Sequence, residues 1–357
     1  MVVSNEQWGD VWFSKQHYAY ELARLGHQIY FINPTKKWKI KNFFSTKIVE
    51  DVINNNLSIL TYQNNLPQGK IFIFFVRIND YFNCLKIKRR IKHESSQLIW
   101  WKFDPYRFLS SKPLKGKIIY HVVDPHLHLW QDKIQAKQAD LIISSSEKYI
   151  NSYKKMECKN IIKIPHGISD DEFELDQNKV VNYKKKYGDY VIIIGTIAAD
   201  VNINLIRLIA LEKINIVVIG PEAISSNEWE AIKKMKNVHY LGSAHAKELK
   251  HHIAGAKAGL ITYNFISKQK GQVTRTPLKA LNYLAQNLPV ITTIDSEIKE
   301  LENKGVYWAK NENDYLRFVK HSINSELNID TERIKSYLNQ HQYSKLISNI
   351  LKQLAKC

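Results

Sequence analysis

The feature that most constrains the fold is a series of short apolar runs in the second half of the chain. The runs are Tyr190–Ile194, Ile214–Ile219, Val238–Leu241, Gly259–Tyr263 and Val290–Thr293, and a glycine or asparagine directly follows each of the first four. Amphipathic, helical stretches separate them. Strands that alternate with helices predict parallel βαβ units. We therefore expect an α/β domain with a parallel sheet in this half.

The first half of the chain shows the same alternation. A helix is expected at Ser14–Leu25, where Gly26 stops it, and apolar runs on both sides predict strands. These strands are expected at Met1–Ser4, Gln28–Ile32, Ser58–Tyr62, Ile71–Val76, Leu98–Trp101, Ile118–Val123, Leu141–Ser144 and Ile161–Ile164. The simplest architecture is two α/β domains that face a cleft, with ligands bound beyond the carboxyl ends of the strands.

The expected boundaries follow a Pro-His-Gly loop at 165–167. We predict a first domain over 1–168, a second over 169–330, and a polar helical tail over 331–357 that packs back on the first domain. A chain of 357 residues is long enough for two domains that each bury a core.

The charge balance favours an anionic partner. Lys and Arg number 52 against 34 Asp and Glu, which gives a net charge of +18. Such a surplus suits nucleic acid, anionic lipid or a phosphorylated substrate, although a Lys- and Asn-rich proteome would also produce it. RNA binding needs a recognisable module and none is present, so we expect no nucleic-acid partner.

Cysteine and histidine usage predicts neither disulfides nor a metal site. Cys84, Cys158 and Cys357 are widely spaced, as in proteins of a reducing cytoplasm. His121, His126 and His128 lie close together, but no carboxylate or cysteine completes a ligand spacing. No signal peptide and no apolar run of about 20 residues is present. We expect a cytoplasmic protein without a resident cofactor.

The stretch 274–293 combines a basic loop, a helix and a buried strand. Pro277 suits the first turn of a helix, and apolar residues at spacings of three and four follow it. Arg275 and Lys279 flank the start of this helix. Free backbone N–H groups beside cations form an anion site, so a diphosphate is the expected ligand.

The second half resembles the donor domain of GT-B glycosyltransferases of bacterial polysaccharide assembly, in the group of families 1 and 4. The matching segments are IPHGI at 164–168, YVIIIGTI at 190–197, VVIGPE at 217–222, VHYLGSAHAKEL at 238–249 and TPLKALNYLAQNLPVITT at 276–293. Their order and spacing agree over about 160–295, and the N-terminal 31 residues from Ser4 look like the opening of the same enzymes. The resemblance implies a GT-B fold, two Rossmann-like domains facing a central cleft.

The resemblance also implies site residues in both domains. On the donor side these are the residues at strand ends and on the helix after Pro277: Gly195, Thr196, Glu222, Tyr263, Arg275, Lys279 and Asn282. The first loop faces the acceptor in such enzymes, which points to Trp8, Gly9, Asp10 and His17. A structural turn at Gly195-Thr196, and ordinary surface roles for Lys279 and Glu222, are the alternatives.

One departure from the family pattern bears on the mechanism. Many retaining members carry two glutamates eight positions apart, and this chain has Thr274 and Asn282 there. The glucuronosyltransferase of xanthan assembly is similar in carrying an amide at the second position; its family inverts the anomeric centre with an aspartate base. The matching aspartate here is Asp124, with Asp104 as second choice and Asp10 with His17 as third.

Two basic segments interleave lysine or arginine with aromatic residues, at 36–44 and 85–92. Such stretches suit the interface of an anionic membrane, and a solvated helix face is the alternative. A membrane surface fits a lipid-linked sugar acceptor, so we expect a peripheral protein on the inner face of the cell membrane.

These observations predict a metal-independent, inverting glycosyltransferase of capsule or lipopolysaccharide synthesis. It would move a sugar from a nucleoside diphosphate, with UDP as first choice, to a glycan or lipid-linked acceptor. Three alternatives stay open: a retaining transferase, a nucleotide-sugar epimerase or hydrolase on the same fold, and a non-catalytic basic protein that binds an anionic polymer or a membrane.

Overall fold

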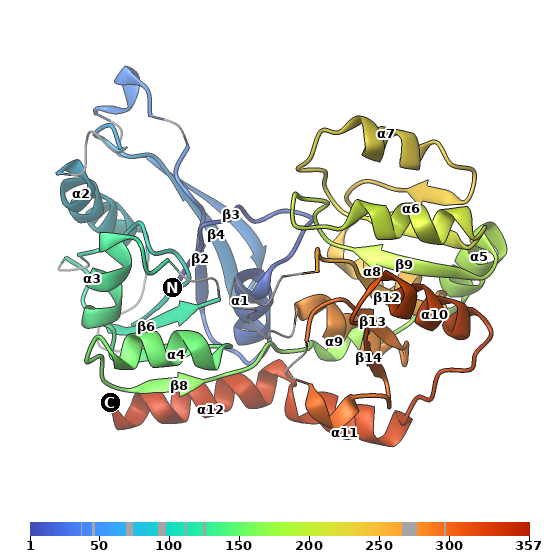
Figure 1. Ribbon diagram of the computed structural model, residues 1–357. Coiled ribbons are helices and arrows are strands. Elements are labelled where there is room, and N and C mark those ends of the chain that lie inside the picture. The colour runs from blue at the N-terminus through green and yellow to red at the C-terminus, as the bar shows by residue number, and fades with distance from the viewer. Residues whose placement is uncertain are drawn as a thin grey trace. The chain divides into compact units, whose positions relative to one another are not determined.

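The computed structural model divides the chain into two compact units. It describes residues 1–36, 38–44, 47–68, 74–91, 98–110, 113–123, 126–265, 277–295 and 298–357. Unit 1 comprises Met1–Pro165 together with Tyr343–Cys357, and unit 2 comprises His166–Gln342. Each unit contains its own sheet (Figure 1). Each also has its own buried hydrophobic clusters.

The sheet of unit 1 is parallel except at one edge. Its strands, in spatial order, are β3 (Ile48–Asn54), β4 (Leu57–Tyr62), β2 (Ile29–Ile32), β1 (Val2–Val3), β5 (Ile99–Lys102), β6 (Lys117–Val122), β7 (Leu141–Ser144) and β8 (Ile161–Lys163). Only the β3–β4 pair among these is antiparallel. The inner strands are buried on both faces, as the continuous apolar runs predict.

The helices of unit 1 include one from the far end of the sequence. They are α1 (Ser14–Arg24), α2 (Phe75–Arg90), α3 (Trp130–Gln138), α4 (Glu147–Lys154) and α12 (Tyr343–Lys356). The last of these, red in Figure 1, packs apolar residues such as Ile347 and Ile350 into the same cluster as Tyr18 and Leu22 of α1. Lys117 of β6 also donates a 3.0 Å hydrogen bond to the Leu354 carbonyl.

The sheet of unit 2 is parallel throughout its described strands. Their spatial order is β11 (Val238–Tyr240), β10 (Asn215–Ile219), β9 (Tyr190–Ile194), β12 (Ala258–Ile261), β13 (Val290–Thr292) and β14 (Val306–Trp308). The accompanying helices are α5 (Gln177–Tyr187), α6 (Ile203–Leu211), α7 (Asn227–Lys233), α8 (Ala246–Ala254), α9 (Leu278–Ala285), α10 (Glu312–Ile323) and α11 (Thr331–Gln340). All carboxyl ends of these strands meet at one edge of the sheet.

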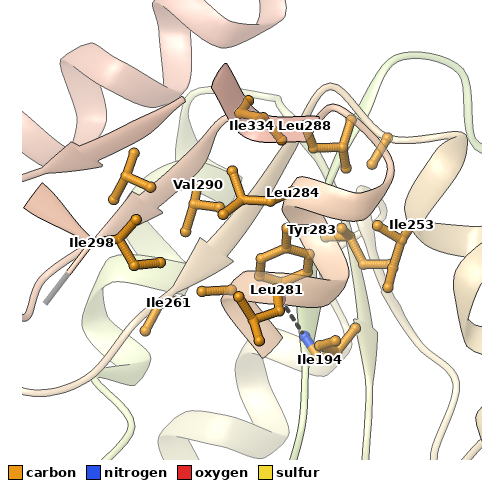
Figure 2. Packing of buried hydrophobic residues seen from close by; sticks show 14 of the residues in the cluster. Ile194, Ile253, Ile261, Leu281, Tyr283, Leu284, Leu288, Val290, Ile298 and Ile334 are labelled. Atoms are coloured by element: carbon orange, nitrogen blue, oxygen red, sulfur yellow. Dashed lines mark hydrogen bonds between the residues drawn. The ribbon is translucent and has the colours of Figure 1, made fainter. Parts of the chain in front are cut away.

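Helix α9 is anchored on this sheet through Tyr283 (Figure 2). The fully buried hydroxyl of Tyr283 accepts a 3.0 Å hydrogen bond from the Ile194 N–H and donates a 3.2 Å bond to the Leu260 carbonyl. The ring covers Gly259, where an added Cβ would lie only 2.0 Å from the ring carbon Cγ. The glycine in β12 therefore allows α9 to approach the sheet closely.

The predicted elements agree with the structure in most places and differ in three. Phe75 and Val76, expected in a strand, begin helix α2, while residues 71–73 of that expected strand lie outside the described residues. The expected helical tail over 331–357 is two helices, α11 and α12, that belong to different units. Strands β3 and β14 carry no clear alternation and were not expected.

Candidate functional site

The carboxyl edge of the sheet in unit 2 brings two glycines into close contact. Gly195 follows β9 with φ of +106°, and Gly220 follows β10 with φ of +153°, both in the region that favours glycine. A Cβ on Gly220 would lie 2.0 Å from the Gly195 carbonyl oxygen. Thr196, next in the chain, is exposed. At this edge the glycines have no side chains that would separate their peptide groups from a ligand.

Lys279, in the first turn of α9, extends over this glycine edge. Its Nζ lies 3.4 Å from the position of a Cβ on Gly195 and 4.8 Å from the centre of the Tyr263 ring. Tyr263 follows β12. Helix α9 and the segments after β12 and β9 therefore bring together the Lys279 cation, the Tyr263 ring and the Gly195 peptide. Gly195, Tyr263 and Lys279, all predicted from the sequence, lie together here.

Asn282 lies one turn beyond Lys279 on α9 and is 9% exposed. Near it lies Glu172, which belongs to a short 3-10 helix, η4 (Asp170–Phe173). Burial raises the pKa of the Glu172 carboxyl to about 7, while Lys250 and the Asn282 side chain act to lower it. The sequence analysis missed Glu172, because a glutamate among four consecutive polar residues carries no signal of burial.

Glu222 is already engaged by its neighbours. Its carboxylate accepts a 2.6 Å hydrogen bond from Trp229 Nε1 and forms a 2.7 Å ion pair with Lys233. Both interactions lower its pKa, so Glu222 carries a charge at neutral pH. Its predicted role in holding a ribose or a base stays a prediction. Arg275 lies outside the described residues, as does Thr274.

In unit 1 the predicted acceptor residues gather around a tryptophan that the sequence analysis had not singled out. Trp12 lies 5.3 Å from the rings of both Trp8 and His17, and its Nε1 donates a 3.0 Å hydrogen bond to the Gly9 carbonyl. The Trp8 N–H donates to Asn33 at the end of β2. Asp10 is exposed in the same loop. Burial lowers the pKa of His17 to about 4, so this imidazole is neutral at pH 7.

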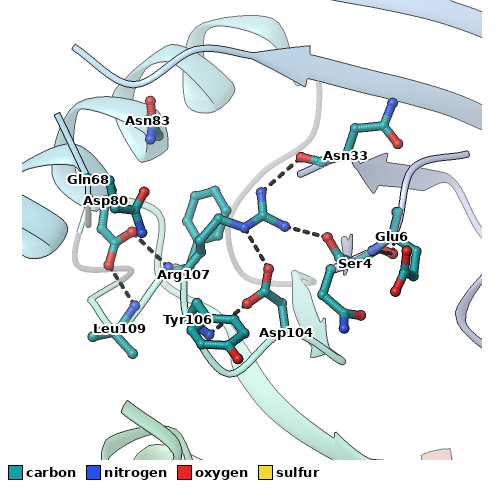
Figure 3. A network of polar contacts seen from close by, with 12 residues as sticks. Ser4, Glu6, Asn33, Gln68, Asp80, Asn83, Asp104, Tyr106, Arg107 and Leu109 are labelled. Atoms are coloured by element: carbon teal, nitrogen blue, oxygen red, sulfur yellow. Dashed lines mark hydrogen bonds and ion pairs between the residues drawn. The ribbon is translucent and has the colours of Figure 1, made fainter. Parts of the chain in front are cut away.

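The aspartate candidates of unit 1 differ in what the structure describes. Asp124, predicted as the base, follows β6 but lies outside the described residues. Asp104 is buried, and its two oxygens accept 2.6 Å hydrogen bonds from Arg107 Nε and from the Tyr106 N–H (Figure 3). Asp104 thus has a structural role at the carboxyl end of β5.

Arg107 extends this network across the sheet edge of unit 1. Its guanidinium also donates to the carbonyls of Ser4 and Asn33 and to the Tyr62 hydroxyl (Figure 3). Removing one partner of a buried ion pair costs about 3–5 kcal/mol, because the other charge is left uncompensated. The network therefore fixes the ends of β1, β2, β4 and β5 relative to one another.

Nowhere in the described ranges do three His, Cys, Asp or Glu side chains come together as a metal ion would require. No helix in the described part of the chain is long and apolar enough to cross a bilayer.

Among the solved structures that this chain resembles, three match over almost its whole length. HepE of Anabaena, solved in complex with UDP and glucose, matches with a TM-score of 0.70 over 100% of this chain and 99% of its own, at 9% identity. WaaG, a glycosyltransferase involved in lipopolysaccharide biosynthesis, matches with 0.64 over 98% and 97%, at 13% identity. The UDP-GlcNAc 2-epimerase of Methanocaldococcus jannaschii matches with 0.56 over 100% and 99%, at 12% identity.

The chain has the GT-B fold. No protein-family model matches the sequence, and no curated protein matches it significantly. At identities of 9–13% the agreement with solved structures concerns the fold. Because this GT-B fold serves both a transferase and an epimerase, the reaction has to be argued from the residues of the site.

Proposed function

We propose that this protein is a glycosyltransferase that uses a nucleoside diphosphate sugar, with UDP as the first nucleotide to test. The observation that carries the proposal is the position of Lys279, whose Nζ lies over Gly195 and beside Tyr263 at the carboxyl edge of the sheet. In open α/β sheets this edge binds ligands. A cation above bare backbone, at the start of a helix, fits a diphosphate.

The proposed reaction needs a base and a means of stabilising the leaving group. An acceptor hydroxyl attacks the anomeric carbon, its proton passes to Asp124, and the bond from that carbon to the diphosphate oxygen breaks with inversion. The electron pair leaves with the nucleoside diphosphate, whose added charge Lys279 and Arg275 stabilise in place of a metal ion. Gly195, Thr196, Glu222, Tyr263 and Asn282 complete the proposed donor site.

The proposed acceptor is a glycan or a lipid-linked oligosaccharide of bacterial surface polysaccharide synthesis. HepE was solved with UDP and glucose, and WaaG takes part in lipopolysaccharide biosynthesis, which supports this class of substrate. Aromatic surfaces suit sugar rings, and the loop of Trp8, Gly9, Asp10 and Trp12, with His17 beside it, provides one in unit 1.

We also propose that the protein binds the cytoplasmic face of an anionic membrane as a peripheral protein. Ile40 is 81% exposed and Phe44 is 86% exposed, in a segment that also carries exposed Lys36, Lys39 and Lys41. Exposed apolar side chains among cations suit the headgroup region of anionic lipid. Trp38 anchors this segment, since its Nε1 donates a 2.9 Å hydrogen bond to the Asn65 carbonyl.

The decisive experiment measures binding of UDP by the shift in melting temperature, with and without EDTA. We expect UDP to stabilise the protein in both conditions and Lys279→Ala to reduce UDP affinity about tenfold or more, because a charge-assisted contact contributes about 1.5–3 kcal/mol. Lys335→Ala, at an exposed position on α11, is the matched control. Unchanged affinity in Lys279→Ala would refute the assignment of the diphosphate site.

The epimerase on the same fold supplies the second candidate function. Incubation with UDP-sugars and no acceptor separates the two reactions, since an epimerase returns an isomeric UDP-sugar and a transferase requires the acceptor for turnover.

A further inference from the structure

Helix α2 of unit 1 reverses the usual arrangement of polar and apolar faces. A surface helix of a globular protein normally turns its apolar stripe toward the core and its charged residues toward solvent. In α2 the buried polar and charged side chains are Asn79, Asp80, Asn83 and Lys86. Large apolar side chains are exposed instead, with Phe74 78%, Tyr81 50% and Phe82 43% exposed. The core of unit 1 does not account for this apolar face.

The buried polar side chains of α2 bind the backbone of two loops. Asn79 accepts a 2.9 Å hydrogen bond from the Leu66 N–H and donates a 3.0 Å bond to the Leu66 carbonyl. Asp80 accepts bonds of 2.8 and 2.7 Å from the N–H groups of Phe108 and Leu109 (Figure 3). These bonds fix which side of α2 faces unit 1. A rotation that buried the apolar side would break them and leave polar groups unpaired.

The outward side of α2 is a continuous apolar stripe with cations beside it. Residues three or four positions apart lie on one side of a helix. The stripe and the cations beside it, all partly or fully exposed, are Phe74, Ile78, Tyr81, Phe82 and Leu85, and Arg77, Lys88 and Arg89. The only acid of α2 is Asp80, which is buried on the opposite side. Contiguous exposed apolar patches of this kind mark interaction surfaces.

The loop bound by Asn79 also holds the exposed segment 38–44. The Asn65 carbonyl accepts a 2.9 Å hydrogen bond from Trp38 Nε1, and Asn65 Nδ2 donates a 2.9 Å bond to the Phe43 carbonyl. Asn65 directly precedes the residue that Asn79 binds. Short hydrogen bonds therefore connect α2 to the segment for which membrane contact is already proposed.

The charges decide which kind of partner suits the outward face of α2. Two copies of the chain that met through α2 would bring Arg77, Lys88 and Arg89 of both copies together, and like charges repel. An anionic bilayer instead offers hydrocarbon to the aromatic rings and phosphate groups to the cations. The long stems of lysine and arginine suit this zone, because their charged ends reach the headgroups.

We propose that the outward face of α2 docks on an anionic lipid bilayer, with the helix in the headgroup region and its aromatic side chains inserted. The inference rests on the proposed function and deepens it, because it names the element that binds the membrane and the class of lipid. The 16 residues of α2 extend over about 24 Å, so this face adds a large surface to the segment 38–44. In Figure 1, α2 lies on the outside of unit 1.

The test measures sedimentation with vesicles of phosphatidylglycerol and phosphatidylcholine in equal parts. We expect Tyr81→Gln/Phe82→Gln to weaken binding about tenfold or more, because two aromatic side chains lose their insertion into lipid. Glutamine is polar and favours helix, so α2 is retained. Val181→Gln/Leu211→Gln, at exposed apolar positions on helices of unit 2, is the matched control and should bind as the original protein does.

A second variant removes charge and leaves the apolar stripe intact. Arg77→Gln/Lys88→Gln/Arg89→Gln should weaken binding about fivefold for each cation at low salt, and less at high salt, where the attraction is screened. The triple change to glutamine at 184–186, in the last turn of α5, removes the same charge from unit 2 and should bind more tightly than the α2 variant. Vesicles of phosphatidylcholine alone should retain little of the original protein.

The folding of each variant is checked by its melting temperature and by the further shift with UDP. Both should equal those of the original protein, because the changed side chains are exposed in unit 1 and the proposed nucleotide site is in unit 2.

Two results would overturn the inference. Vesicle binding that is unchanged in both α2 variants contradicts it, even if Ile40→Ser/Phe44→Ser binds weakly. A dimer of the original protein without lipid, converted to monomer by Tyr81→Gln/Phe82→Gln, would show that a second copy covers this face. If UDP does not stabilise the original protein, the proposed transferase fails instead, whatever the vesicles show.

Discussion

At the scale of single residues, unit 2 contains a close backbone contact between two glycines and a buried carboxylate oxygen without a described partner. Gly220 has φ of +153° and approaches the Gly195 carbonyl so closely that no Cβ could fit. Glu172 is buried with an unpaired oxygen. The first needs glycine at position 220, and the second costs free energy that the rest of the fold must offset.

A change in the pH dependence of stability tests the burial of Glu172. Its pKa is about 7 in the folded protein against 4.5 for an ordinary glutamate, so the native state retains a proton that the unfolded state has released between these values. This group therefore lowers the free energy of unfolding as pH rises through the window, by up to about 3 kcal/mol. We expect Glu172→Gln to be more stable than the original protein at pH 8, with the difference shrinking toward pH 4.5, in denaturant unfolding.

The original protein has to be compared with Glu172→Gln, because a buried histidine also makes stability depend on pH. Burial lowers the pKa of His252 to about 4, so this group makes the free energy of unfolding increase as pH rises from about 4 to 6.5, opposite to the effect of Glu172. Because both proteins keep His252, its contribution cancels in the difference. A difference that does not vary with pH would contradict the raised pKa of Glu172.

At the scale of elements, helix α9 combines a buried face with a ligand face. Leu281 and Leu284 pack into the cluster that contains Ile194 and Val290 (Figure 2), while Lys279 and Asn282 belong to the proposed site. The sheet determines where Lys279 lies, because Tyr283 fixes the helix on β9 and β12.

Removing the Tyr283 hydroxyl tests this anchoring. In Tyr283→Phe the buried Ile194 N–H loses its acceptor, which costs about 1–3 kcal/mol and lowers the melting temperature by about 2–10 °C for a unit of this size. Tyr315→Phe is the matched control, because that buried hydroxyl makes only a 3.4 Å bond to Ile291. Equal losses in the two variants, measured by calorimetry, would show that α9 is held by its apolar face alone.

At the scale of the whole molecule, the net charge of +18 and the exposed apolar side chains favour an anionic surface. We expect the protein to sediment with vesicles that contain phosphatidylglycerol and to be released as salt is raised, since screening weakens such attraction. Replacing Ile40 and Phe44 by serine should reduce binding at least fivefold, because both side chains lose their insertion into lipid.

The control for this experiment removes exposed apolar side chains from the other unit. Val181 is 60% exposed and Leu211 is 58% exposed, and both belong to unit 2. Serine at both positions should leave vesicle binding unchanged. Equal binding by all three proteins would exclude the segment around Ile40 and Phe44 as the docking surface.

The sequence by itself determined most of the elements and the fold class, because the signals for these are local. Apolar runs such as Tyr190–Ile194 and Leu141–Ser144 coincide with β9 and β7, and the glycines after β9 and β10 mark strand ends. Periodicity and turn residues act within a few positions of the chain. They indicated two α/β domains, and solved structures bear out the GT-B fold.

Only the tertiary structure decided which side chains meet, because burial and partners depend on segments far apart in the sequence. Lys279 was predicted as a cation at a helix start, but its position over Gly195 depends on the packing of α9 through Tyr283. Glu172, 110 positions before Asn282 in the printed sequence, reads as an ordinary surface acid until the fold buries it. The desolvation that raises its pKa has no counterpart in the local sequence.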